Sequence, residues 1–210
     1  MRTAVAAQPA VSLSDRAYTI HDVIELNTGG WPRFEVLDGA LLVSPAPGLD
    51  HQNISDNLRY VLGRVVPPKT AITSAANLRL HDDLTAFIPD LVVTHPEVKA
   101  RDRAFYEADD ALLVIEVVSP GNRRQDRVTK HAVYAEAGIP FYWRVETVPF
   151  RSQGDAQLPV VLVHALSGDG YRELERLPAG EPGRLTHPFT VEFDPQDMLD
   201  PYWSIERFRD

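Results

Sequence analysis

The amino-acid sequence predicts an α/β fold in which a mixed central β-sheet is flanked by helices, with a β-hairpin toward each end of the chain. Two patterns support this class. An apolar run, a helical stretch and a second apolar run follow one another over residues 111–145, an order typical of parallel strand pairing. Apolar segments on either side of an Asp-Gly turn and a Gly-Asp-Gly turn predict the two hairpins.

Length and composition are those of one globular domain. The 210 residues predict a loose leader over 1–14, a single domain over 15–200 and a C-terminal tail over 201–210. No apolar run approaches the roughly 18 residues of a membrane span, so no membrane partner is expected. The chain has no cysteine, which excludes disulfides and thiolate zinc sites and is consistent with a cytoplasmic location. The net charge of −9 argues against nucleic-acid affinity through overall charge, so any such binding needs local cations.

The first half of the chain mixes helices and strands. Apolar residues at helical spacing predict helices over residues 18–26 and 49–66, the second of them ended by two prolines. Between these helices, RFEVLDGALLVS predicts a hairpin with strands at 34–37 and 40–44. Two further strands are expected within residues 70–80 and 86–96, and the charged segment 99–110 is expected to be a loop.

The second half begins with the longest apolar run. Residues 111–118 predict a strand buried on both faces, followed by an SPGN turn, a helix over 124–137 and a strand over 141–145. The segment 159–177 predicts the second hairpin. A short strand and an aromatic-bearing tail are expected to close the chain.

Three carboxylates interrupt segments that otherwise indicate buried strands. Glu35 lies in FEVL, Asp90 in IPDLVV and Glu116 in VIEVV. If these strands are neighbours, the carboxylates converge, repel one another and raise one another's pKa values. A hard divalent cation such as Mg²⁺ relieves that repulsion. Asp90 as a turn residue and Glu35 on the solvent face of an edge hairpin remain open alternatives.

Lys130 lies on the helix that follows the Glu116 strand. Asp126, Lys130 and Tyr134 are four residues apart and therefore share one helical face. Carboxylates, a metal and one lysine are suited to phosphodiester hydrolysis, because the lysine can stabilise developing negative charge. A structural Glu116–Lys130 ion pair and a surface Asp126–Lys130 helix pair remain the alternatives.

Several segments together resemble the Uma family of putative restriction endonucleases, a bacterial group with the PD-(D/E)XK fold. The matching pieces are FEVLDGALLVSPAPGLDHQNI, IPDLVV and LLVIEVVSPGNRRQDRVTKHAVYAEAGIPFYWRV. The resemblance implies a restriction-endonuclease-like core. It makes Asp90 and Glu116 the acids of the motif and Glu35 an additional metal ligand. The motif lysine is absent at Val118, and Lys130 matches a lysine moved to the following helix.

The resemblance also implies residues around the site. His51 matches a recurring histidine at the start of the second helix, and Tyr134 is expected to pack or hydrogen-bond beside the acids. Arg123, Arg124 and Arg127 form a basic cluster next to Glu116 and are candidate phosphate contacts.

The function that follows is a metal-dependent endonuclease that hydrolyses DNA with Mg²⁺, or with Mn²⁺ in its place. The alternative is a catalytically inactive binding or regulatory protein on a nuclease scaffold. RNA or a nucleotide is a third possible substrate. Double-strand cleavage by such folds implies paired active sites, so a homodimer is expected. Trp31, Trp143 and Trp203 are interpreted as core or interface residues rather than base-stacking platforms.

Overall fold

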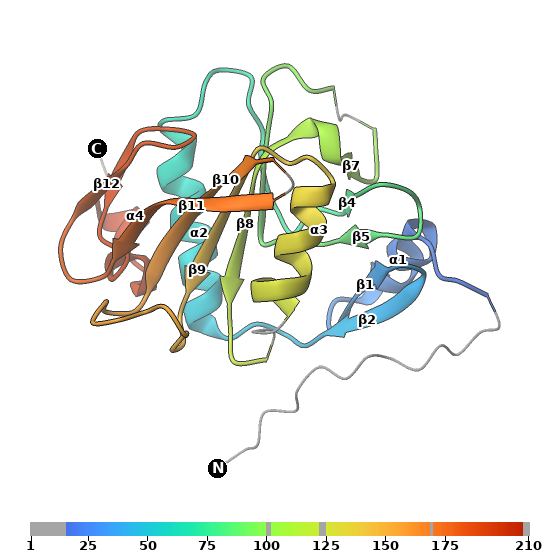
Figure 1. Cartoon of the computed structure of the whole chain (residues 1–210), viewed down its shortest axis with the longest axis horizontal. Helices are drawn as coiled ribbons and strands as arrows, with labels where there is room; N and C mark the ends of the chain where they lie inside the picture. The colour runs from blue at the N-terminus through green and yellow to red at the C-terminus, as the bar shows by residue number, and fades with distance from the viewer. Residues whose placement is uncertain (1–15, 100–101, 122–124, 169, 208–210) are drawn as a thin grey trace, which may run out of the picture.

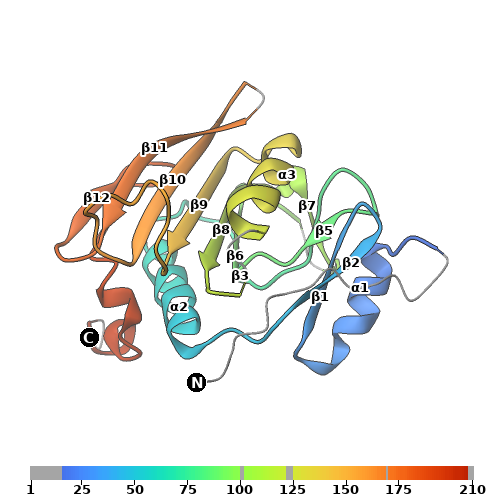
Figure 2. The same ribbon diagram turned by 60° about the horizontal axis from the view of Figure 1, so that its bottom comes forward.

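A computed structural model describes residues 16–99, 102–121, 125–168 and 170–207 as a mixed α/β fold (Figure 1). Its centre is a six-stranded sheet with the order β11-β10-β9-β8-β6-β3. Helix α2 (Leu49–Gly63) covers one face of this sheet, and helix α3 (His131–Glu136) covers the other. A second sheet with the order β2-β1-β5-β4-β7 lies to one side (Figure 2). The predicted class is confirmed, but the predicted single sheet is divided.

The strands of the central sheet are β3 (Ile72–Ser74), β6 (Leu91–Thr94), β8 (Ala111–Val118), β9 (Phe141–Glu146), β10 (Val160–Ser167) and β11 (Gly170–Pro178). The strands of the second sheet are β1 (Arg33–Leu37), β2 (Ala40–Ser44), β4 (Leu78–Arg79), β5 (Ala86–Phe87) and β7 (Tyr106–Glu107). A separate pair joins β12 (Gly183–Leu185) to β13 (Val191–Phe193). The remaining helical elements are α1 (Ile20–Leu26), α4 (Trp203–Arg207), the 3₁₀ turns η1 (Asn27–Gly29), η2 (Ala108–Asp110) and η4 (Asp197–Leu199), and the π-helical η3 (Gln125–Lys130).

Strands β8 and β9 confirm the predicted strand–helix–strand unit. They pair in parallel, with Glu116 opposite Arg144, and η3 and α3 form the connection between them. Because side chains alternate along a strand, Leu113 and Ile115 of β8 pack on the α2 side, whereas Val114 packs on the α3 side. Glu116 follows the same alternation, which directs it toward the helical segment that carries Lys130.

The first hairpin forms as its turn residues predict. Asp38 and Gly39 both have positive φ, at 49° and 75°, as a two-residue turn between twisted strands requires. The hairpin packs its Val36 against Ile20 and Val23 of helix α1. β1 also pairs with β5, which places the hairpin at the edge of the second sheet.

Two predicted strands are broken, and each break leads from one sheet to the other. Within residues 70–80 the chain leaves β3 and enters β4 through Ala75, which has a φ of 49° that ends the extended run. Within residues 86–96 it leaves β5 and enters β6 through Pro89 and Asp90. Asp90 therefore lies in a bend between two strands and does not interrupt one.

Three smaller predictions also need correction. The segment expected to be a loop contains β7 and η2, and the helix expected over 124–137 begins as the π-helical η3. The C-terminal strand has a partner, β12, that the sequence did not indicate. In the tail, half-buried Trp203 of α4 packs against the main core. No helix of the described part of the chain is long and apolar enough to cross a membrane.

Candidate active site

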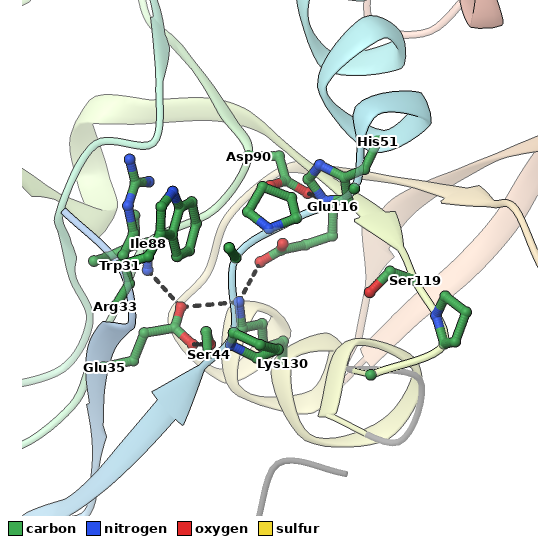
Figure 3. A pocket seen from close by; sticks show the side chains of 16 residues that line it. Trp31, Arg33, Glu35, Ser44, His51, Ile88, Asp90, Glu116, Ser119 and Lys130 are labelled. Atoms are coloured by element: carbon green, nitrogen blue, oxygen red, sulfur yellow. Dashed lines mark hydrogen bonds and ion pairs between the residues drawn. The ribbon is translucent and has the colours of Figure 1, made fainter. Parts of the chain in front are cut away.

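The carboxylates predicted to form a site meet where the two sheets adjoin. Glu35 comes from β1 in the second sheet, Glu116 from β8 in the central sheet, and Asp90 from the crossing between β5 and β6. With His51 and Lys130 they line a pocket of about 420 Å³ (Figure 3). Residues far apart in the sequence are therefore gathered at one junction of the fold.

Lys130 links the two sheets through its ammonium group. Its Nζ lies 2.9 Å from Oε1 of Glu35 and 2.9 Å from Oε1 of Glu116. Burial lowers the pKa of Lys130, but the surrounding carboxylates raise it more, so the pKa lies well above its ordinary value. The ammonium group remains charged, and the predicted Glu116–Lys130 ion pair is present.

Glu116 is buried in the floor of the pocket, with 2% of its surface exposed. Its Oε1 accepts a hydrogen bond from Lys130 Nζ at 2.9 Å and another from the Tyr134 hydroxyl at 2.7 Å. Burial raises the pKa of Glu116 to about 7, although Lys130 lowers it, and the charges of Asp90 and Glu35 add to the rise. This carboxyl therefore changes its charge near neutral pH.

Replacing Glu116 with glutamine is expected to flatten the pH dependence of stability. The pKa of Glu116 is about 7 in the folded protein but roughly 4.3 in an unfolded chain, so its ionisation costs stability as pH rises through that interval. Glutamine has a similar shape and cannot ionise. Between about pH 5 and about pH 8 the free energy of unfolding, measured with urea, should therefore fall less in Glu116→Gln than in the wild type.

The matched control for this prediction is Glu136→Gln, since Glu136 is exposed at the end of α3. That variant should follow the wild-type pH profile. Parallel profiles for the wild type and Glu116→Gln would contradict the raised pKa.

The Tyr134 hydroxyl stabilises the Glu116 carboxylate, so Tyr134→Phe is expected to cost about 1–3 kcal/mol, the usual cost of a lost hydrogen bond to a buried charged group. Both side chains are buried. Chemical denaturation at neutral pH would measure the loss. Tyr202→Phe, at a position 62% exposed, should change the free energy of unfolding by less than about 0.5 kcal/mol. An equal effect of the two substitutions would contradict the assignment.

Asp90 is oriented by groups from both neighbouring elements. The backbone N–H of Val117 donates to its Oδ2 at 2.7 Å, and Nε2 of His51 lies 3.1 Å from the same oxygen. Burial lowers the pKa of His51, but the hydrogen bond to Asp90 and the charges of Asp90 and Glu116 together raise it more, so the pKa lies above its ordinary value. His51 occupies the first turn of α2, as its position in the sequence predicted.

Glu35 is engaged by the protein on both oxygens. Its Oε1 accepts from the backbone N–H of Ile88 at 2.7 Å and from Lys130, and its Oε2 accepts from the Ser44 hydroxyl at 3.3 Å. The side chain is buried, so the alternative that placed it on a solvent face is wrong. Glu35 contacts the lysine of the site directly.

Asp126 belongs to this cluster, although the sequence offered only a surface helix pair for it. It is buried, its Oδ1 lies 3.8 Å from Lys130 Nζ, and neither carboxylate oxygen has a hydrogen-bond partner within the described ranges. Burial raises its pKa well above the ordinary value, and the charge of Glu116 adds to the rise. The four-residue spacing between Asp126 and Lys130 was the signal in the sequence that could have placed Asp126 in the cluster.

Arg127 is the member of the predicted basic cluster that lies within the described residues. Arg127 turns toward β9, where its guanidinium contacts the buried Glu146 at 2.6 Å and donates to the backbone oxygens of Val148 and Pro149. Its described contacts are those of a structural ion pair, and its role as a phosphate contact stays a prediction. Arg123 and Arg124 lie outside the described residues.

Several lining residues of the pocket were not predicted as site residues. Trp31 and Arg33 lie on the wall of the pocket formed by the segment leading into β1 (Figure 3). Of the two interpretations offered for Trp31, the core residue is wrong, because 43% of its surface is exposed, and the interface residue stays a prediction; Trp143 is buried in the core. Side chains alternate along a strand, so Arg33 and Glu35 lie on the same face of β1. This spacing was the signal in the sequence that could have identified Arg33.

The profile of the Uma2 family, described as putative restriction endonuclease, matches residues 21–198. The chain belongs to the Uma2 family. Among solved structures, it is similar to a putative nuclease belonging to DUF820 from Anabaena variabilis ATCC 29413, with a TM-score of 0.60 and 20% identity. That match covers 89% of this chain and 98% of the other, which shows a shared fold. No curated protein matches the chain.

A buried valine occupies position 118, where the resemblance described above implied the motif lysine. Lys130 reaches Glu116 instead from η3, the helical segment after the strand. The ammonium group and the acid are thus in contact even though their spacing in the sequence is changed.

The donor set of the Uma2 pocket suits a cation that takes few protein ligands. Across the described residues, no group of three His, Cys, Asp or Glu side chains is arranged to hold a metal ion. Glu35 already uses both oxygens within the protein, which leaves Asp90 and Glu116 as the carboxylates available to a cation. Mg²⁺ is commonly held by one or two carboxylates plus waters and substrate oxygens, so this pair fits it.

Proposed function

We propose that the chain is a metal-dependent endonuclease that hydrolyses phosphodiester bonds in DNA. Asp90 and Glu116 would hold Mg²⁺ or Mn²⁺, and Lys130 would be the electrostatic partner. The observation that carries the proposal is the buried ammonium group of Lys130, 2.9 Å from Glu116 at the floor of an open pocket. A lysine with that contact supplies the third part of the PD-(D/E)XK set, which the strand itself lacks.

The roles of the protein groups follow from their contacts. Lys130 is held in place by Glu35 and Glu116, so its remaining N–H can donate to a non-bridging phosphate oxygen and stabilise the charge that develops there. His51 and the Val117 N–H fix the orientation of Asp90. A bound Mg²⁺ would polarise the phosphodiester and lower the pKa of a coordinated water.

Glu35 is proposed as a positioning residue for Lys130 in place of a metal ligand. Its contacts to Ile88 and Ser44 tie the ammonium group to the second sheet. Asp126 is a further neighbour of Lys130 and can hold a proton in the same buried cluster.

The test is cleavage of covalently closed circular DNA, single-stranded and supercoiled, with Mg²⁺, with Mn²⁺ and with EDTA. The proposal predicts metal-dependent opening of the circles, which identifies internal cleavage because closed circles have no ends. A linear RNA of matched sequence serves as competitor. Cleavage of RNA alone would redirect the proposal to a ribonuclease.

If neither metal supports cleavage and calorimetry detects no binding of either cation, the non-catalytic scaffold is the better description. The homodimer expected for double-strand cleavage remains a prediction, and light scattering at micromolar concentration measures it.

A further inference from the structure

Trp31 presents an indole ring at the wall of the pocket. Its surface is 43% exposed, although tryptophan is highly buried on average; Trp143 is fully buried, and Trp203 packs against the core. The ring lies on the side of the pocket formed by the β1 segment, across from Asp90 and His51 (Figure 3). An exposed aromatic face in this position is available to a ligand.

Arg33 completes the same wall. Its guanidinium carbon lies 4.5 Å from the centroid of the Trp31 ring, within cation–π distance. The guanidinium covers part of the indole and still lines the pocket, so the pair offers a flat aromatic surface with a positive charge beside it. Arg33 is two residues from Glu35 on β1, and Glu35 contacts Lys130. One strand therefore carries both the arginine of the wall and the glutamate that contacts the lysine.

The segment that carries Trp31 is tied to the start of β1. The side-chain amide of Asn27 donates to the Phe34 carbonyl at 2.9 Å and accepts from the Phe34 N–H at 2.8 Å. Gly30 allows the chain to turn with a φ of 92°. The closed loop holds the indole at the pocket, so little ordering is needed when a ligand stacks on it.

We propose that Trp31 and Arg33 form a platform on which an unpaired base of single-stranded or locally opened DNA stacks next to the Lys130–Glu116 centre. This inference rests on the proposed function and names its substrate class. Bases in a duplex have both faces covered by neighbours, so an indole can stack only on a base that is unpaired or turned out. Aromatic platforms with neighbouring cations bind single strands in this way.

The test compares binding of a fluorescent dT 12-mer with binding of a 12-base-pair duplex, measured by anisotropy in EDTA so that no hydrolysis occurs. Trp31→Leu removes the aromatic ring, and Trp31→Phe keeps an aromatic face. The leucine variant should weaken binding of the dT 12-mer by about tenfold, the phenylalanine variant by less than about threefold. Duplex binding should change by less than about twofold in both.

A stacking readout separates this role from a structural one. A single-stranded 12-mer with one 2-aminopurine in a dT background should lose fluorescence on binding to the wild type and to Trp31→Phe, but not to Trp31→Leu. Tyr202→Leu, which removes an exposed aromatic in the C-terminal segment, is the matched control and should bind like the wild type.

Wild-type affinity of Trp31→Leu for the dT 12-mer, or equal weakening toward single strand and duplex, would overturn the platform. These outcomes are distinct from failure of the proposed function. If binding to single strands depends on Trp31 but no metal-dependent cleavage occurs, the platform is supported and the proposed endonuclease function is contradicted. Cleavage by the wild type together with unaltered single-strand binding by Trp31→Leu supports the endonuclease and rules out the platform.

Discussion

Lys130→Met is expected to destabilise the protein by about 3–5 kcal/mol at neutral to alkaline pH, the usual cost of removing one partner from a buried ion pair. The substitution leaves Glu35 and Glu116 buried without the ammonium group that now lies 2.9 Å from each of them. Methionine preserves most of the volume of the side chain, so the lost charge dominates. Urea unfolding at about pH 8 measures the difference.

The deficit of Lys130→Met should shrink as pH falls. Burial raises the pKa of Glu116 and Lys130 lowers it, so without the lysine the pKa of Glu116 rises further and the folded variant binds more protons than its unfolded chain. Its stability relative to the wild type therefore increases toward about pH 5. Lys69→Met is the matched control, because Lys69 pairs with Glu97 on the exposed surface, and it should cost less than about 1 kcal/mol. Equal effects of the two substitutions would contradict the central role given to Lys130.

Asp90→Asn is expected to reduce metal-dependent cleavage by about a thousandfold or more. The asparagine keeps the shape of the side chain and an acceptor for the Val117 N–H, which donates to Asp90 at 2.7 Å. It removes the negative charge that a hard cation requires. A thousandfold loss corresponds to about 4 kcal/mol, within the range of several kcal/mol that metal assistance supplies.

Calorimetric titration with Mg²⁺ should show weakened binding in the same variant. Asp56→Asn, an exposed position on α2, is the matched control and should leave both cleavage and cation affinity unchanged. Full cation affinity in Asp90→Asn would remove Asp90 from the ligand set.

The sequence predicted those helices and strands that are determined by residues adjacent to one another in the chain. The bounds of β8 match the prediction because its apolar run is continuous and ends at a turn. The β1–β2 hairpin follows from its Asp-Gly turn. The divided sheets could not be predicted in this way, since the left-handed backbone of Ala75 and the crossing at Asp90 depend on two sheets that the chain joins only in three dimensions.

The same distinction applies to the site. Its acids and its lysine could be named from motif spacing, and the structure gathers them around one pocket. The contact between Lys130 and Glu35 could not be anticipated. It joins η3, the helical segment after a strand of the central sheet, to β1 of the second sheet. Trp31 carried no periodic signal, and its exposure depends on the loop that Asn27 closes.

We propose that the acids and the lysine of this pocket act together on a phosphodiester. The most direct measurement is nicking of supercoiled plasmid with Mg²⁺ by the wild type, Glu116→Gln and Lys130→Met, each shown by circular dichroism to be folded under the assay conditions. The wild type should nick the plasmid, EDTA should abolish the nicking, and both variants should have lost it. Nicking that persists at the wild-type rate in both variants would contradict the proposal.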